Sequence, residues 1–137
     1  MTKGRAMFEE ADLIYRYTRK QAIEDGVLVD LMQPYTCPLV REAGFKLPIA
    51  MTSTAFSETV CPIDGELPDS QDCKGRLWDV LMVLKAGIRI APAGEDRIYF
   101  KVSVWDGQRS NEVQLWALCG PGDEGEPVIT IMLEGED

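Results

Sequence analysis

The feature that most constrains the fold is a change of hydrophobic period in the second half of the chain. Over residues 72–86 the apolar residues recur at helical spacing, and Leu77, Leu81 and Leu84 fall on one stripe. After a break at residues 91–94 the period becomes two, which is the spacing of a strand with one buried face. The sequence therefore predicts a long amphipathic helix followed by strands that pack against it.

Three alternating segments follow, joined by two turns rich in Gly, Pro and Asp. The residues predicted to face inward are Ile98, Phe100, Val102 and Val104 in the first segment, Val113, Leu115, Ala117 and Cys119 in the second, and Ile129, Ile131 and Leu133 in the third. Consecutive strands with short connections typically form an antiparallel meander. We expect an α+β domain in which this C-terminal three-stranded meander packs on the one long helix.

The N-terminal half predicts short helices and a short strand, which complete a single domain over residues 1–137. Thr18 and Gln21 have the spacing of a capping box that opens a short helix, and Gly26 is suited to end it. The other expected elements are a strand at 27–29, a helix at 38–43, an extended segment at 46–52 and a helix through residue 60 capped by Ser53 or Thr54. We expect a loose arm at 1–12, a strand or extended lead-in at 13–17 and a surface loop at 61–69.

Negative charge is concentrated at the end of the chain. The net charge is −9, of which residues 1–109 carry −2 and residues 110–137 carry −7. Such a field repels nucleic acid and attracts basic surfaces. We therefore expect a protein partner with a basic surface and no direct contact with DNA or RNA.

Six carboxylates flank the last predicted strand and are the first candidate binding residues. They are Asp123, Glu124, Glu126, Glu134, Glu136 and Asp137. Because the strand between them must be packed, the charges are held in place, and a fixed acidic ridge can imitate phosphate groups. The alternative is that these acids are solvated and serve solubility only.

Aromatic residues supply the second group of candidates. Tyr99 and Trp105 share the outward parity of their strand, and Trp116 points outward from the next one. If no helix covers that face, the three side chains form an exposed patch suited to a protein partner. The alternative is burial, because tryptophan is large and is usually mostly covered.

The residue types exclude several common catalytic mechanisms. The chain has no histidine, so Ser-His-Asp triads, Cys-His pairs and His-ligated metals are excluded. It also lacks a nucleophile elbow, a Walker loop, a dinucleotide fingerprint and an EF-hand loop, and the glycines of residues 120–125 suit a turn. We assign no catalytic residue, no metal and no cofactor. An enzyme that uses only carboxylates remains an alternative.

The four cysteines, Cys37, Cys61, Cys73 and Cys119, are widely spaced and contain no Cys-x-x-Cys pair. We expect free thiols in a reducing compartment rather than an irregular zinc cluster. No apolar run approaches the ~20 residues of a membrane span. The N-terminus lacks the pattern of a secretory signal, which favours the cytoplasm.

Four segments of the chain resemble a small uncharacterised family, a domain of unknown function carried by bacteria, plasmids, integrative elements and phages. These segments are residues 14–30, 41–45, 75–81 and 120–137. Family members are typically of this length, so the resemblance covers the whole protein and implies no catalytic residue. The chain departs from the usual sequences in residues 30–39 and in its four cysteines.

The resemblance also implies a setting. Accessory genes of plasmids and phages often encode small acidic proteins that inhibit host defence, including anti-restriction and anti-CRISPR proteins, several of which mimic DNA. We expect a non-enzymatic inhibitor that acts in the bacterial cytoplasm on a nucleic-acid-binding defence complex. The alternatives are an accessory binding or regulatory module without an anti-defence role, and the carboxylate-based enzyme.

Overall fold

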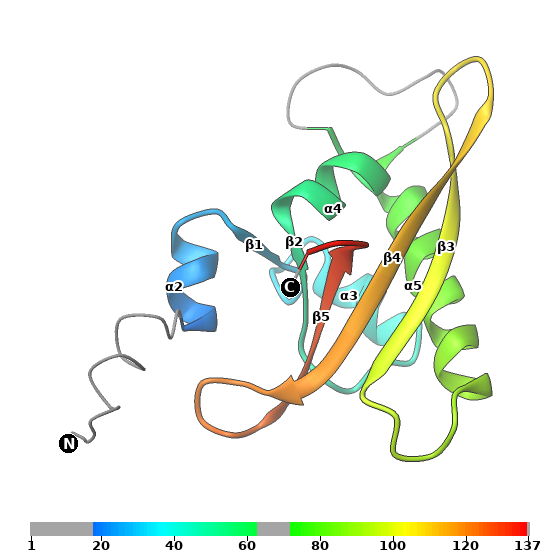
Figure 1. Ribbon diagram of the computed structural model, residues 1–137. Helices are drawn as coiled ribbons and strands as arrows, with labels where there is room; N and C mark the ends of the chain where they lie inside the picture. The colour runs from blue at the N-terminus through cyan, green and yellow to red at the C-terminus, as the bar shows by residue number, and fades with distance from the viewer. Residues whose placement is uncertain (1–17, 63–71, 137) are drawn as a thin grey trace.

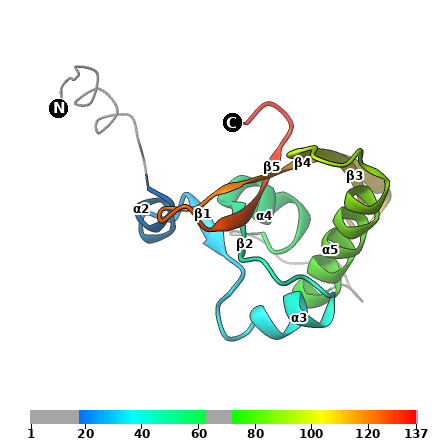
Figure 2. The same ribbon diagram turned by 90° about the horizontal axis from the view of Figure 1, so that it is seen from below.

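The computed structural model describes residues 18–62 and 72–136, in which a layer of helices packs on one face of a five-stranded sheet (Figures 1 and 2). The helices are α2 (Arg19–Glu24), α3 (Cys37–Glu42), α4 (Ser53–Thr59) and α5 (Cys73–Ile90), and the strands are β1 (Leu28–Asp30), β2 (Ile49–Thr52), β3 (Arg97–Trp105), β4 (Ser110–Pro121) and β5 (Pro127–Leu133). The α+β class is confirmed. The predicted arm, the lead-in at 13–17 and most of the loop at 61–69 lie outside the described residues.

The strands lie in the order β1-β2-β5-β4-β3. Strands β3, β4 and β5 form the predicted antiparallel meander. Strand β2 pairs with β5 in parallel, with Ile49 opposite Ile129, and β1 pairs with β2 antiparallel. The extended segment predicted at 46–52 therefore becomes an interior strand, and it places β5 inside the sheet with neighbours on both sides.

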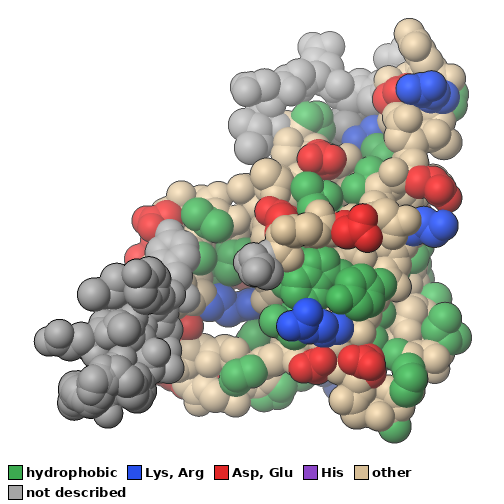
Figure 3. Space-filling view, in the orientation of Figure 1, with side chains coloured by type: hydrophobic (Ala, Val, Ile, Leu, Met, Phe, Trp, Pro, Cys, Tyr) green, Lys and Arg blue, Asp and Glu red, His purple; other side chains and the backbone are tan. Residues whose placement is uncertain are grey.

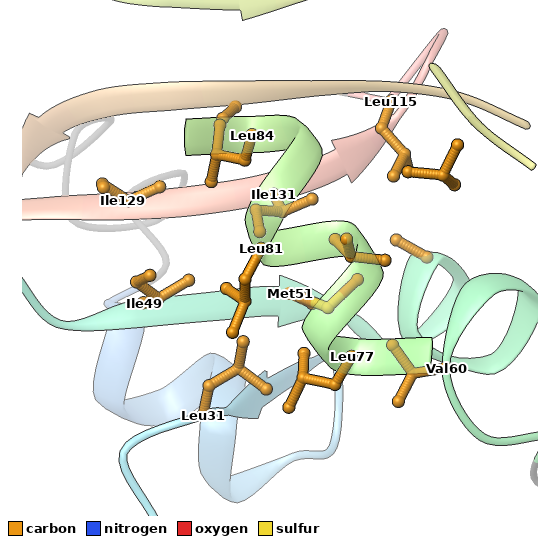
Figure 4. Packing of buried hydrophobic residues seen from close by; sticks show 14 of the residues in the cluster. Leu31, Ile49, Met51, Val60, Leu77, Leu81, Leu84, Leu115, Ile129 and Ile131 are labelled. Atoms are coloured by element: carbon orange, nitrogen blue, oxygen red, sulfur yellow. The ribbon is translucent and has the colours of Figure 1, made fainter. Parts of the chain in front are cut away.

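The core lies between the sheet and helices α3, α4 and α5. Leu77, Leu81 and Leu84 of α5 are at most 1% exposed, and Figure 4 shows Leu81 beside the strand residues Ile49 and Ile131. The predicted inward residues of the meander all belong to this core or pack against its edge. We call this side of the sheet the inner face. The opposite side is the outer face, and α3, α4 and α5 do not cover it (Figure 2).

Helix α5 is longer than predicted, because Gly87 does not end it. The helix continues to Ile90, and Ala91 is its C-cap. A Cβ added at Gly87 would lie 3.0 Å from Cγ2 of Ile98 in β3. The glycine therefore allows the helix to approach the strand closely, which is a tertiary requirement that local helix-stop rules do not reveal.

The short helices differ from prediction mainly at their caps. The capping box of Thr18 and Gln21 is present, and Gly26 follows α2 with a φ of +79°. Helix α4, however, is capped by Thr52, whose Oγ1 accepts a hydrogen bond from the Ala55 N–H at 3.2 Å. The predicted caps Ser53 and Thr54 are wrong, because β2 runs directly into the helix and its last extended residue takes the N-cap position.

The expectation of four free thiols is wrong for two of the cysteines. Cys61 and Cys73 form a disulfide with their Cα atoms 5.2 Å apart, which joins the segment after α4 to the first residue of α5. Cys37 and Cys119 are free and half-buried. The spacing of cysteines along a chain does not show which of them the fold brings together. No helix within residues 18–62 and 72–136 is long and apolar enough to cross a membrane.

Candidate partner-binding face

The outer face carries most of the predicted binding residues. Figure 3 looks onto it and shows hydrophobic side chains gathered at the centre, with acidic side chains above and below them. The alternation of β4 and β5 directs one set of side chains to the inner face, so the other set must point outward. The outward set includes Trp116, Leu118, Val128, Thr130 and Met132.

Tyr99 and Trp116 are neighbours on this face, and the structure brings them together. They are opposite each other in β3 and β4, their ring centroids lie 6.1 Å apart, and the ring planes meet at 19°. The guanidinium carbon of Arg97 lies 5.1 Å from the centre of the Trp116 ring. Tyr99 is 64% exposed, whereas Trp116 is only 6% exposed, so the tyrosine and the arginine present the stack to a partner.

Trp105 does not join this stack. It ends β3, six residues beyond Tyr99, which corresponds to ~20 Å along a strand. Trp105 is 39% exposed as a residue, and its carbonyl oxygen accepts a hydrogen bond from the Arg76 side chain. The alternation of side chains along the strand predicted a single aromatic patch. In the structure its members are instead divided between the two ends of β3.

The carboxylate of Asp123 caps a helix in the same molecule. One of its oxygens accepts the backbone N–H of Arg19 at 2.8 Å and the other accepts that of Lys20 at 3.0 Å. These bonds lie at the N-terminus of α2, where a negative charge is favourable. The hydrogen bonds from Lys20 and Arg19 lower the pKa of Asp123 below its ordinary value. Asp123 thus fastens the β4–β5 turn to α2.

Glu136 is fastened in the same way at the other end of β5. Its carboxylate accepts hydrogen bonds from Oγ1 of Thr52 and of Thr54, both at 2.7 Å, and from the Leu133 N–H at 2.8 Å. Burial acts to raise the pKa of Glu136, but these hydrogen bonds outweigh it and the pKa is lowered. The Glu136 carbonyl also accepts the indole N–H of Trp116 at 2.9 Å. The segment after β5 is thereby held over the outer face.

Three predicted acids are exposed and remain suited to a partner: Glu124 and Glu126 in the β4–β5 turn, and Glu134 after β5. Glu126 does accept one local hydrogen bond, from the Glu124 N–H at 3.0 Å. Asp137 lies outside the described residues. Because β5 has seven residues, the two acidic ends are ~23 Å apart along the strand, and they form two clusters rather than one ridge.

Arg19 is a residue of this face that sequence reasoning missed. Its guanidinium reaches from α2 to β5, where it donates to Oγ1 of Thr130 at 2.6 Å and to the Ile129 carbonyl at 3.0 Å. The capping box showed that Arg19 begins a helix, but no local pattern shows which strand that helix approaches. Arg19 borders a pocket of about 750 Å³ between α2 and the outer face.

No group of three or more potential metal ligands occurs within the described ranges. The pocket on the outer face has Arg19, Asp123 and three threonines as its polar groups. This arrangement can bind and orient a ligand by hydrogen bonding. Among the described residues that line the pocket, Asp123 is the one carboxylate, whereas carboxylate acid–base catalysis uses a pair.

The comparison with protein families gives one result. Residues 5–137 match the model of DUF6573, a family of unknown function. The chain belongs to this family. No curated protein and no solved structure matches it. The predicted resemblance to an uncharacterised family is confirmed.

Proposed function

We propose that this DUF6573 protein is a non-enzymatic inhibitor that binds a basic, nucleic-acid-binding surface of a bacterial defence complex. The observation that carries the proposal is the composition of the outer face. An exposed stack of Tyr99 and Arg97 on Trp116 lies between exposed carboxylates at both ends of β5. Aromatic and arginine side chains are frequent interface anchors, and acidic groups around them favour a basic partner.

The contact residues in this proposal are fewer than the sequence suggests. Glu124, Glu126 and Glu134 would meet the partner's basic side chains in place of phosphate groups. Asp123 and Glu136 would act indirectly, because their carboxylates already accept hydrogen bonds within the chain. The protein would act in the bacterial cytoplasm, where its target complexes meet foreign DNA.

Phage plating on bacteria that carry a DNA-cleaving defence system tests this function. Cells with an RNA-guided nuclease or a restriction system that targets the phage should plate it poorly. Expression of the chain should restore plating at least tenfold with one of these systems. If no such system is inhibited, the protein is an accessory module without an anti-defence role, and the proposal is wrong.

A triple variant identifies the surface that acts. Changing Glu124, Glu126 and Glu134 to Gln should abolish the rescue of plating, because it removes the exposed charge at both ends of β5. The matched control is E42Q/E58Q/D79N, which removes three exposed charges from α3, α4 and α5 in the helical layer. Equal loss of rescue in both variants would point to net charge rather than to the outer face.

A further inference from the structure

The pocket on the outer face has the size of a small-molecule site. Its volume is about 750 Å³, and pockets for small ligands commonly measure ~300–1,000 Å³. Helix α2 and the residues after it form one wall, and the outward side chains of β4 and β5 form the floor. The apolar lining includes Ala22, Val27, Leu28, Leu118, Val128 and Met132. This lining suits an apolar body rather than a sugar or a nucleotide.

Among the described residues that line this apolar space, Arg19 carries the one basic side chain. A guanidinium has five N–H donors, and that of Arg19 bonds two acceptors of the protein, the Thr130 hydroxyl and the Ile129 carbonyl. Both acceptors are uncharged, and no carboxylate in the described ranges forms an ion pair with this guanidinium. Donors therefore remain for a ligand, together with a positive charge that no carboxylate of residues 18–62 or 72–136 contacts directly.

The electrostatics agree with this geometry. Burial lowers the pKa of Arg19, and the attraction of Asp30, Asp123 and Glu126 offsets this only in part. Asp123 and Asp30 already accept hydrogen bonds within the chain, from the backbone N–H groups of Arg19 and Lys20 and from that of Met32 respectively. A ligand anion would thus compensate a charge that the protein leaves partly uncompensated.

The same acids limit what the anion can be. The described part of the pocket lining offers one guanidinium, and Asp30, Asp123 and Glu126 lie close enough to act on it. A dianion such as a phosphate monoester would be repelled by these carboxylates, whereas a single negative charge matches the single positive one. A carboxylate also fits the planar fork of a guanidinium through two parallel hydrogen bonds.

We propose that this pocket binds a small amphipathic monocarboxylate, such as a medium-chain fatty acid. The carboxylate pairs with the Arg19 guanidinium, and the apolar chain lies against Leu118, Val128 and Met132. The proposed partner contacts Glu124, Glu126 and Glu134 do not line this pocket, although Glu126 acts on Arg19 through its charge. The proposal does not depend on the defence-inhibitor function. The ligand would bind beside the β4–β5 turn that carries two of those acids.

Binding of an eight-carbon series to the full chain tests the chemistry without any mutation. We expect octanoate to bind about tenfold more tightly than 1-octanol, as measured by calorimetry, because a charge-assisted bond to Arg19 is added to the same apolar contact. The Thr130 and Met132 methyl resonances should shift on binding. Octylammonium and octyl phosphate should bind more weakly than octanoate.

Three outcomes would overturn the proposal. Equal affinity for 1-octanol and octanoate would mean that Arg19 does not hold the ligand. Tighter binding of octyl phosphate would assign the site to phosphates. Tighter binding of a short apolar peptide with a free C-terminal carboxylate would make it a peptide-docking site.

A variant that keeps Arg19 locates the site in the pocket. Leu118→Asp adds a carboxylate to the lining, where it should compete for Arg19 and weaken octanoate binding more than tenfold. Ile90→Asp makes the same change at a side chain that is 86% exposed at the end of α5, and it should leave the affinity unchanged. Retained octanoate affinity in folded Leu118→Asp, checked by circular dichroism, would show that the pocket is not the site.

Discussion

The inner and outer faces of the sheet differ in what holds their side chains in place. On the inner face, residues such as Leu81 and Ile131 are fully buried against one another and against the helices. On the outer face, polar contacts fasten the covering segments: Asp123 holds α2 and Glu136 holds the segment after β5. The inner face is therefore maintained by apolar burial. The outer face combines the burial of Trp116, Val128 and Met132 with a few directional hydrogen bonds that variants can remove one at a time.

The largest loss of stability is expected from a substitution in the buried core of the inner face. Leu81→Ala should lower the free energy of unfolding by about 3 kcal/mol, because it removes a buried side chain and leaves a cavity. Urea denaturation measures this loss. The outer-face counterpart Leu118→Ala should cost about 1 kcal/mol or less, because Leu118 is only half-buried. Equal losses in the two variants would contradict the difference between the faces.

The disulfide is expected to stabilise the domain without changing the outer face. Changing Cys61 and Cys73 to Ser should lower the free energy of unfolding by about 2–3 kcal/mol, because a short loop is no longer closed in the unfolded chain. Octanoate affinity and phage rescue should be unaffected, since neither cysteine lies on the outer face. Cys37→Ser is the control, because its free thiol makes no disulfide. Altered octanoate affinity in the double variant would link the two faces.

A moderate loss of stability is expected from removing the Glu136 carboxylate, which holds the segment after β5 over the outer face. Glu136→Ala should cost about 1–2 kcal/mol, because the Thr52 and Thr54 hydroxyls and the Leu133 N–H lose their acceptor. Trp116 fluorescence should also shift to the red as its cover loosens. The exposed neighbour Glu134 provides the matched control, and Glu134→Ala should change neither signal. An unchanged Trp116 spectrum in Glu136→Ala would show that the segment is held by other contacts.

The smallest loss of stability is expected from removing the Asp123 carboxylate, which caps α2. This loss depends on pH. The folded-state pKa of Asp123 is below its ordinary value of 3.8, so its contribution to stability is present above pH 3.8 and is lost as the pH falls further. Asp123→Asn should therefore be less stable than the wild type at pH 7, and the gap in melting temperature should narrow as the pH falls below 3.8. Glu124→Gln removes a charge from the same turn without removing the cap. A gap in Asp123→Asn that is independent of pH would sink this account.

Local sequence patterns determined the second half of the fold. The alternation from Ile98 to Leu133 and the leucine stripe of α5 predicted the meander, its inward residues and the helix that covers it. These features depend on the hydrophobic period of a strand or a helix, and that period can be recognised from residues close together in the sequence. The capping box of α2 was likewise predicted from a four-residue pattern.

Only the tertiary structure decided how distant segments meet. The parallel pairing of β2 with β5, the Cys61–Cys73 disulfide and the reach of Arg19 to Thr130 each join residues that no local pattern relates. The candidate site changed for the same reason. The sequence determined that acids flank β5. The fold determined that the carboxylates of Asp123 and Glu136 accept hydrogen bonds within the chain, because packing places N–H and O–H donors beside them.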